Sequence, residues 1–192
     1  MLRHTLPALC LLACIARGQD PEKPLTVQGK FNFHVGQMAS PLFPVEMAAS
    51  AAILQELDTP REWGQGAGAY GKRFVSTTGA SALRYVFAFG LDSTLHEDPR
   101  YRRSGRGNLF VRLGHAGRET FVTRTDDGGT HFSTWRFGSA FGAAYLSNQW
   151  YPDRLNTVAS GFEQGAATIG LDLLQNIGRE FWPDIKHKVF RR

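Results

Sequence analysis

The second half of the chain repeats small residues at helical spacing, and this pattern constrains the fold more than any other feature. Gly138 and Gly142 fall on one face of a predicted helix, and Gly161 and Gly165 on one face of the next. Small residues four positions apart let two helix backbones approach closely. Glycine in a helix costs ~1 kcal/mol relative to alanine, so its repetition indicates a packing role. We interpret the pattern as packing within the protein; docking onto a bilayer or a partner helix is the alternative.

Helical periodicity covers most of the chain. Apolar and small residues recur about every three to four positions rather than alternating strictly. The predicted helices are residues 41–57, 73–95, 108–122, 132–150 and 156–181. Residues 62–71 are predicted as a Gly-rich loop or loosely wound turn, 125–129 as a turn, and 182–184 as the end or a kink of the last helix. We therefore predict an all-α fold: one compact bundle of four to five helices over residues 36–192.

The first 18 residues have the composition of an export signal. A basic residue, a short apolar run and small residues before Gln19 predict cleavage after Gly18. A looser match to a lipoprotein processing site would instead place a lipid anchor on Cys14. Residues 19–35 are predicted as an extended leader whose last five residues could form a short strand.

Processing after Gly18 would change the chemistry of the mature protein. It removes Cys10 and Cys14, the only cysteines of the sequence, and with them any disulfide or thiol nucleophile. It also lowers the formal net charge from +5 to +3, because Arg3 and Arg17 are lost. This mild charge does not indicate nucleic-acid binding. Beyond the signal, no segment offers the ~18 consecutive apolar residues of a spanning helix.

Residues 66–71 match the GxGxxG spacing of dinucleotide-binding sites, and Lys72 extends the match toward a phosphate-binding loop. A dinucleotide site needs a hydrophobic strand before the glycines, and residues 59–63 do not form one. A phosphate-binding loop needs Ser or Thr after the lysine, where Arg73 stands. We therefore predict no nucleotide and no other cofactor.

The densest cluster of reactive side chains is residues 96–101. His96, Glu97 and Asp98 could perform acid–base chemistry, with Asp126 as a further candidate from a nearby turn. The simpler interpretation is a charged helix end, in which Asp98 pairs with the arginines that follow. No pattern brings additional ligands together, so we predict no metal site.

Further polar residues are candidates for binding. Thr168, Asp172, Asn176 and Glu180 fall on one face of the last predicted helix. They could form a polar layer inside the protein, but we favour a solvent-exposed face, because helices of globular proteins usually expose one polar face to water. The candidate binding residues are Arg100, Tyr101, Arg124, Asp172, Asn176 and Glu180.

Four motifs occur in order along the mature chain: EWGQG followed by YGKR, LHEDPRY, FVTRTD and EFWPDIK. In this set the chain resembles a family of exported bacterial envelope proteins, from about residue 33 onward. The resemblance implies a compartment and domain boundaries, and carries no activity, cofactor or catalytic residue.

We therefore expect an exported helical protein of the periplasm or the outer-membrane periphery. It would act without catalysis, through a membrane surface or an envelope protein, because Trp182 lies beside a basic tail. The alternative is an envelope hydrolase or a lipid- or glycan-modifying enzyme that uses residues 96–98, so enzymatic activity stays open. A third possibility, binding of an anionic polymer, requires Arg100, Arg102, Arg103 and Arg106 on one continuous face.

Overall fold

The computed structural model describes residues 23–190, with side chains to residue 188, and this part of the chain is mostly helical. The α-helices are α2 (Val27–Met38), α3 (Phe43–Glu56), α4 (Ala67–Thr94), α5 (Leu109–Phe121), α6 (Thr134–Ser147) and α7 (Val158–Phe190). Short 3₁₀ turns, η1 (Arg61–Trp63) and η2 (Asn148–Trp150), precede α4 and follow α6. The predicted export signal and Cys14 lie outside the described residues.

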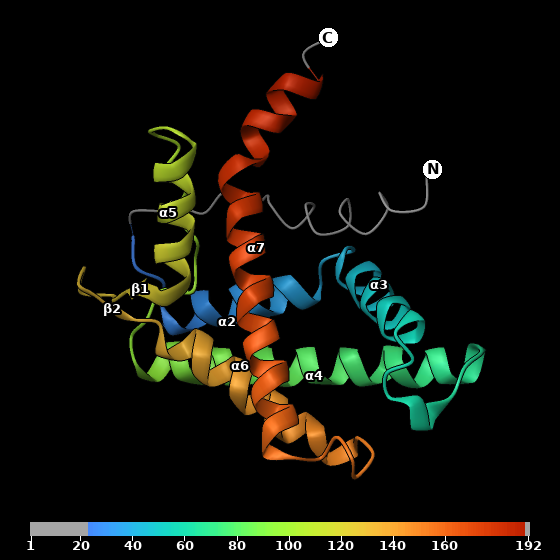
Figure 1. The fold of residues 1–192 in the computed structure, drawn as a ribbon. Coiled ribbons are helices and arrows are strands. Elements are labelled where there is room, and N and C mark those ends of the chain that lie inside the picture. The colour runs from blue at the N-terminus through green and yellow to red at the C-terminus, as the bar shows by residue number, and fades with distance from the viewer. Residues whose placement is uncertain (1–22, 191–192) are drawn as a thin grey trace.

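The long helix α4 organises the other elements. Helices α2, α3 and α6 all pack against it, and α6 also packs against α7. Helix α7 crosses the molecule and passes beside α5, which it contacts (Figure 1). A small antiparallel hairpin of β1 (Val122–Arg124) and β2 (Thr130–Phe132) connects α5 to α6.

The extended leader predicted for residues 19–35 is contradicted from Val27 onward, because this segment forms α2. Thr26 caps the helix, since its hydroxyl accepts a hydrogen bond from the Gly29 amide. Lys30 and His34, one turn apart, are the buried residues of α2. Prediction from the spacing of apolar residues expects apolar side chains on the buried face of a helix, whereas these two are polar.

Two other segments differ from expectation. The turn at residues 125–129 is present, but it joins two short strands that were not predicted, because three residues are too few to show alternation. Helix α7 continues through Pro183 instead of ending there. Arg103 Nε and Arg112 Nη2 donate to the Glu180 carbonyl, in the turn where a proline weakens the helical hydrogen bonding.

The segment that resembled a nucleotide-binding loop has a structural role. Helix α4 begins at Ala67, so two of its glycines lie in the first turns of that helix. Arg73 is fully buried and donates to the carbonyls of Thr59, Pro60 and Gly64. The arginine that replaces the expected Ser or Thr thus holds the loop between α3 and α4.

Glycines mark the closest approaches between helices. A side chain at Gly161 would overlap the ring of Tyr145, and one at Gly165 would overlap the ring of Phe141. Both contacts lie where α7 crosses α6. A side chain at Gly138 of α6 would overlap Leu91 of α4. A side chain at any of these positions would therefore require its neighbour to move, more easily at Gly138, which meets the flexible end of Leu91, than at Gly161 and Gly165, which meet aromatic rings.

Replacing Gly165 with alanine is therefore expected to lower the free energy of unfolding by about 1–3 kcal/mol, the usual cost of overpacking. The matched control is Gly170→Ala on the same helix, where a new methyl group would meet open space. That control is expected to raise the free energy of unfolding by about 0.5–1 kcal/mol, through helix propensity. Urea denaturation measures both, and effects of the same sign would contradict the steric account.

Polar residues fill much of the interior. Of the nine buried hydrophobic residues in the described chain, only Trp135 and Ile169 are larger than alanine. The largest fully buried side chains are instead Arg73, Lys30, Glu97, Glu180, Asn148 and Asn176. Many large apolar side chains are instead exposed to solvent, including Phe110, which is 78% exposed, and Val158, which is 76% exposed. Buried charged side chains are rare in proteins and must be paired. The partners of these residues therefore indicate where a functional site could lie.

Candidate functional site

The connector between α4 and α5, residues 95–108, lies beside the hairpin. Glu97 and Thr125 form an antiparallel bridge, the Asp98 amide donates to the Arg124 carbonyl at 2.8 Å, and the Asp126 amide donates to the His96 carbonyl at 2.8 Å. The extended backbone that Pro99 favours at Asp98 suits this pairing. The structure thus joins residues 96–98 to the Arg124–Asp126 turn, as the enzymatic alternative requires.

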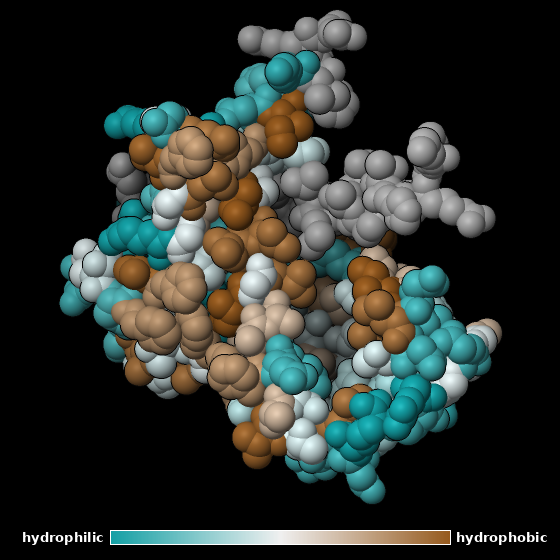
Figure 2. Space-filling model, in the orientation of Figure 1, coloured by the Kyte–Doolittle hydropathy of each residue, from teal (hydrophilic) through white to brown (hydrophobic). Residues whose placement is uncertain are grey.

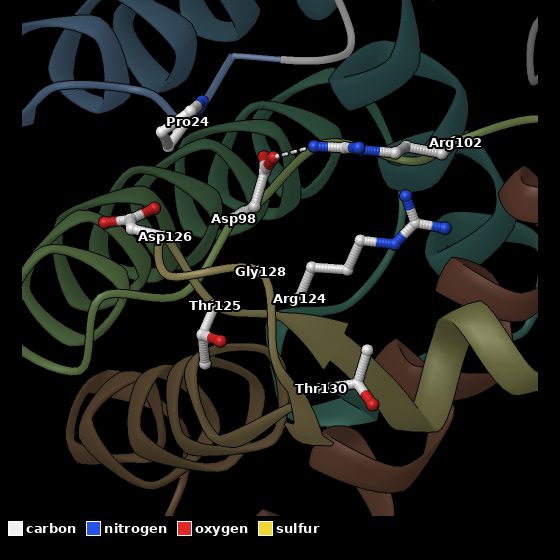
Figure 3. Close-up of a pocket in the computed structure, with 8 residues that line it drawn as sticks. All are labelled: Pro24, Asp98, Arg102, Arg124, Thr125, Asp126, Gly128 and Thr130. Carbon is white, nitrogen blue, oxygen red and sulfur yellow. Dashed lines mark hydrogen bonds and ion pairs between the residues drawn. The ribbon is translucent and has the colours of Figure 1, made fainter.

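A cavity of about 250 Å³ opens where the connector meets the hairpin. It is lined by Pro24, Asp98, Arg102, Arg124, Thr125, Asp126, Gly128 and Thr130 (Figure 3). Gly128 has a φ of +91°, a left-handed conformation that favours glycine and lets the turn fold over the cavity. Three predicted site residues, Asp98, Arg124 and Asp126, therefore meet in one place.

Asp98 is a structural anion rather than a free acid or base. Arg100 donates to it through its backbone amide, Nε and Nη2, and Arg102 Nη2 donates at 3.1 Å. Burial alone would raise the pKa of Asp98, but the hydrogen bonds from Arg100 and then Arg102 hold that pKa below its usual value. A carboxylate held in this way is a poor proton donor or acceptor near neutral pH.

Asp126 lies on the other side of the cavity and has a buried partner. Lys30 Nζ, 1% exposed, donates to its Oδ2 at 2.7 Å and to the Asp92 carbonyl at 2.9 Å. His96 is exposed, with Nδ1 3.7 Å from the same Asp126 oxygen. The other oxygen, Oδ1, is buried without a hydrogen-bond partner in the described structure.

Behind the cavity lies a second buried pair, which the sequence did not suggest. His34 Nε2 is 2.6 Å from Asp92 Oδ2, and both residues are buried. Desolvation raises the pKa of Asp92, although His34 and Lys30 oppose the shift. The signal that could have revealed this layer is the four-residue spacing of Lys30 and His34 on one face of a helix. It was hidden because residues 31–35 alternate as a strand would.

Glu97 is fully buried but does not line the cavity. Its Oε2 accepts a hydrogen bond from the backbone amide of Trp135 in the first turn of α6, and its Oε1 has no hydrogen-bond partner between residues 23 and 188. Burial raises the pKa of Glu97 above its ordinary value, with the Trp135 amide and then His131 opposing that shift. Glu97 is thus placed to hold the start of α6.

The raised pKa of Glu97 predicts a pH-dependent stability. The folded protein holds the Glu97 proton to a higher pH than the unfolded chain does, so wild-type stability falls as pH rises from the unfolded to the folded pKa. Glu97→Gln removes this titration and keeps an acceptor for the Trp135 amide. The free energy of unfolding of Glu97→Gln, relative to wild type, is therefore expected to increase across that interval.

Urea denaturation over a pH series measures this difference. Glu163→Gln, at an exposed position of α7, is the control and is expected to leave the pH profile unchanged. An unchanged profile for Glu97→Gln would contradict the raised pKa.

The polar face of α7 is buried. Our preferred interpretation, that this face is exposed to solvent, is therefore wrong. Glu180, 0% exposed, accepts hydrogen bonds from the Tyr101 hydroxyl at 2.7 Å, the Ser104 and Gly105 amides and Arg112 Nε. Burial would raise the pKa of Glu180, but these donors, Tyr101 foremost, hold it below its ordinary value. The Tyr101 pKa is raised, by burial and then by Glu180. Glu180 therefore fixes the far half of the connector.

Asp172 and Asn176 belong to a separate polar layer. Asp172 Oδ2 accepts a hydrogen bond from Arg84 at 2.5 Å and lies 3.7 Å from Arg136 Nε. Burial lowers the pKa of Arg136 to about 10. Asn176 donates to the Thr120 hydroxyl at 3.0 Å. These residues, like Glu180, do not line the cavity, so the structure separates them from the candidate site.

Three of the four arginines proposed to face an anionic polymer are engaged in ion pairs within the protein. Arg100 and Arg102 pair with Asp98, and Arg103 bonds to Glu180 and Asp184. Of the four, Arg106 is exposed and forms no ion pair with the part of the chain that the structure describes. In the described chain, no group of three or more His, Cys, Asp or Glu side chains is arranged to hold a metal ion. No helix between residues 23 and 190 is both long and apolar enough to cross a membrane.

No family model, curated protein or solved structure matches this chain.

Proposed function

We propose that this protein is exported and acts, without catalysing a reaction, by binding to the surface of an anionic membrane. The observation that carries the proposal is the set of exposed apolar and basic residues at the start of α5 and the end of α7, two segments that the Arg112–Asp184 ion pair joins. The resemblance to exported envelope proteins agrees with it. Within the proposal, the close approaches at glycines reflect packing of the helices as one compact bundle.

Three consecutive apolar residues stand exposed in the first turn of α5. Leu109 is 56%, Phe110 78% and Val111 57% exposed. Asn108 caps this turn, since its side chain accepts a hydrogen bond from the Val111 amide. A run of three exposed apolar residues is costly in water and is typical of a binding surface.

Cations lie next to this run. Arg112 ties α5 to α7 through Asp184 at 2.6 Å, which brings Ile185, Lys186 and Lys188 to the same end of the molecule (Figure 1). These three residues and Arg106 are exposed. Figure 2 shows apolar residues over the upper end of α5 and along α7, with hydrophilic residues beside them. We call the surface formed by Arg106, Leu109, Phe110, Val111, Ile185, Lys186 and Lys188 the basic–apolar tip.

The chemistry of the tip favours a lipid surface over a protein partner. Apolar side chains insert at the boundary between headgroups and acyl chains, while Lys and Arg attract anionic lipids. The nearby acid, Asp184, is already paired with Arg103 and Arg112. The tip therefore presents cations around an apolar centre, which complements an anionic bilayer.

Flotation of the processed protein with lipid vesicles tests the proposal. Binding is expected to vesicles that contain phosphatidylglycerol, to be weaker with pure phosphatidylcholine, and to decrease with salt. The mass of the same protein reports its processing: a chain beginning at Gln19 supports the signal, and a lipidated Cys14 supports the anchor. Absence of binding to either vesicle would overturn the proposal.

The enzymatic alternative is supported by the cavity that joins Asp98 to Asp126. It is weakened by the same geometry, since Asp98 is paired with Arg100 and Arg102 and Glu97 is buried away from the cavity. The alternative predicts that Asp126→Asn abolishes hydrolysis of an envelope lipid or glycan. The membrane-binding proposal predicts no turnover by either form.

A further inference from the structure

The cavity beside the hairpin contains two guanidinium groups whose hydrogen bonding is incomplete. Arg102 donates through Nη2 to Asp98, but its Nε is buried and has no hydrogen-bond partner among the described residues. Arg124 makes no side-chain hydrogen bond within residues 23–188, and its nearest carboxylate oxygen, on Glu119, is 4.0 Å away. Figure 3 shows the Arg124 guanidinium directed toward Arg102.

The carboxylates of the cavity do not balance these two cations. Asp98 already has Arg100, and Asp126 already has Lys30, both from outside the lining. Glu119 also pairs with Arg118 at 3.6 Å. Asp98 is shared by Arg100 and Arg102, and Glu119 by Arg118 and Arg124, so two acids serve four arginines here. Neighbouring guanidinium groups repel each other, and an anion bound between Arg102 and Arg124 would offset that repulsion.

The size of the cavity limits what that anion can be. Pockets for drug-sized ligands occupy roughly 300–1,000 Å³, and this one is about 250 Å³. It therefore suits a single compact group. The planar guanidinium matches the oxygens of phosphate, and two guanidinium groups can hold one phosphate together.

From this geometry we infer that the cavity between the connector and the hairpin binds a phosphate monoester or inorganic phosphate, between Arg102 and Arg124. Arg124 supplies a guanidinium that makes no side-chain hydrogen bond to residues 23–188, and Arg102 supplies the second guanidinium. The hydroxyls of Thr125 and Thr130 lie in the same lining. The site is independent of the basic–apolar tip, and neither proposal requires the other.

Titration calorimetry with inorganic phosphate at constant ionic strength tests the site. Wild-type protein is expected to bind phosphate, and Arg124→Gln to bind it about tenfold more weakly. The matched control is Arg61→Gln, which removes an exposed arginine of η1 that belongs neither to the cavity lining nor to the tip, and is expected to leave phosphate binding unchanged. Arg124→Lys keeps the positive charge but lacks the planar guanidinium. Its affinity for phosphate is expected to lie between those of wild type and Arg124→Gln.

Vesicles distinguish a lipid headgroup from free phosphate as the natural source. Weaker binding of Arg124→Gln to phosphatidic acid vesicles, with phosphatidylglycerol binding unchanged, would identify a lipid phosphomonoester. Loss confined to inorganic phosphate would identify a soluble ligand. The inference is overturned if wild type does not bind phosphate, or if folded Arg124→Gln, verified by circular dichroism, binds it as tightly as wild type.

Discussion

Glu180→Ala is expected to lower the free energy of unfolding by about 3–5 kcal/mol, the largest effect of any substitution considered. Glu180 is fully buried and accepts hydrogen bonds from Tyr101, two backbone amides and Arg112. Its removal leaves Arg112, whose side chain is 13% exposed, with Asp184 as its remaining ionic partner. The two amides of the connector lose their acceptor at the same time.

Glu163→Ala is the matched control for Glu180→Ala. Glu163 lies on the same helix, is exposed, and forms no ion pair with any described residue, so its removal is expected to change stability by no more than about 0.5 kcal/mol. Urea denaturation gives both values. Similar small effects at the two positions would show that the connector is not held by Glu180.

Replacing both Leu109 and Phe110 with serine is expected to weaken binding to phosphatidylglycerol vesicles by about tenfold to hundredfold. Burying one large apolar side chain contributes about 1.5–3 kcal/mol, and tenfold corresponds to about 1.4 kcal/mol. Both side chains are exposed in water, so the double variant is expected to keep the fold. Flotation measures the affinity, and circular dichroism verifies the fold.

The matched control for the serine variant is Val75→Ser combined with Val86→Ser. These valines of α4 are 69% and 67% exposed, so the pair also removes apolar surface, but away from the tip. Its vesicle binding is expected to equal that of wild type. Equal losses in both double variants would indicate unspecific apolar adsorption instead of binding through the tip.

The helices of this protein are largely readable from its sequence. Proline, asparagine and glycine mark the ends of α3 and α5, and the apolar period of three to four places both to within about two residues. Helix α2 escaped prediction because its buried residues, Lys30 and His34, are polar. A rule that follows apolar residues cannot detect a helix whose inner face is charged.

The same limit explains the error at the polar face of α7. Periodicity placed Asp172, Asn176 and Glu180 together but could not say whether water or protein covers them. The answer depends on Tyr101, Arg112 and Arg136, which come from other elements. Whether a polar helix face is buried depends on partner residues that are distant in sequence. The local sequence of the helix carries no information about those partners.

The candidate site was predictable in part. Residues 96–98 and Asp126 were identified as neighbours in one hypothesis, and the hairpin brings them together. The charge state was not predictable, because it depends on Arg100 and Arg102 folding back onto Asp98 and on Lys30 reaching Asp126. These ion pairs tie Asp98 and Asp126 to cations from outside the cavity lining, and the guanidinium groups of Arg102 and Arg124 line the same cavity.

An environment-sensitive fluorophore attached at position 110 tests the membrane-binding account most directly. The processed protein is expected to lack both native cysteines, so Phe110→Cys and Val86→Cys can each be labelled at one site. On phosphatidylglycerol vesicles, emission from the probe at 110 is predicted to shift to shorter wavelength, while the probe at 86 stays in water and does not shift. An unshifted probe at 110, or equal shifts at both positions, would contradict binding through the basic–apolar tip.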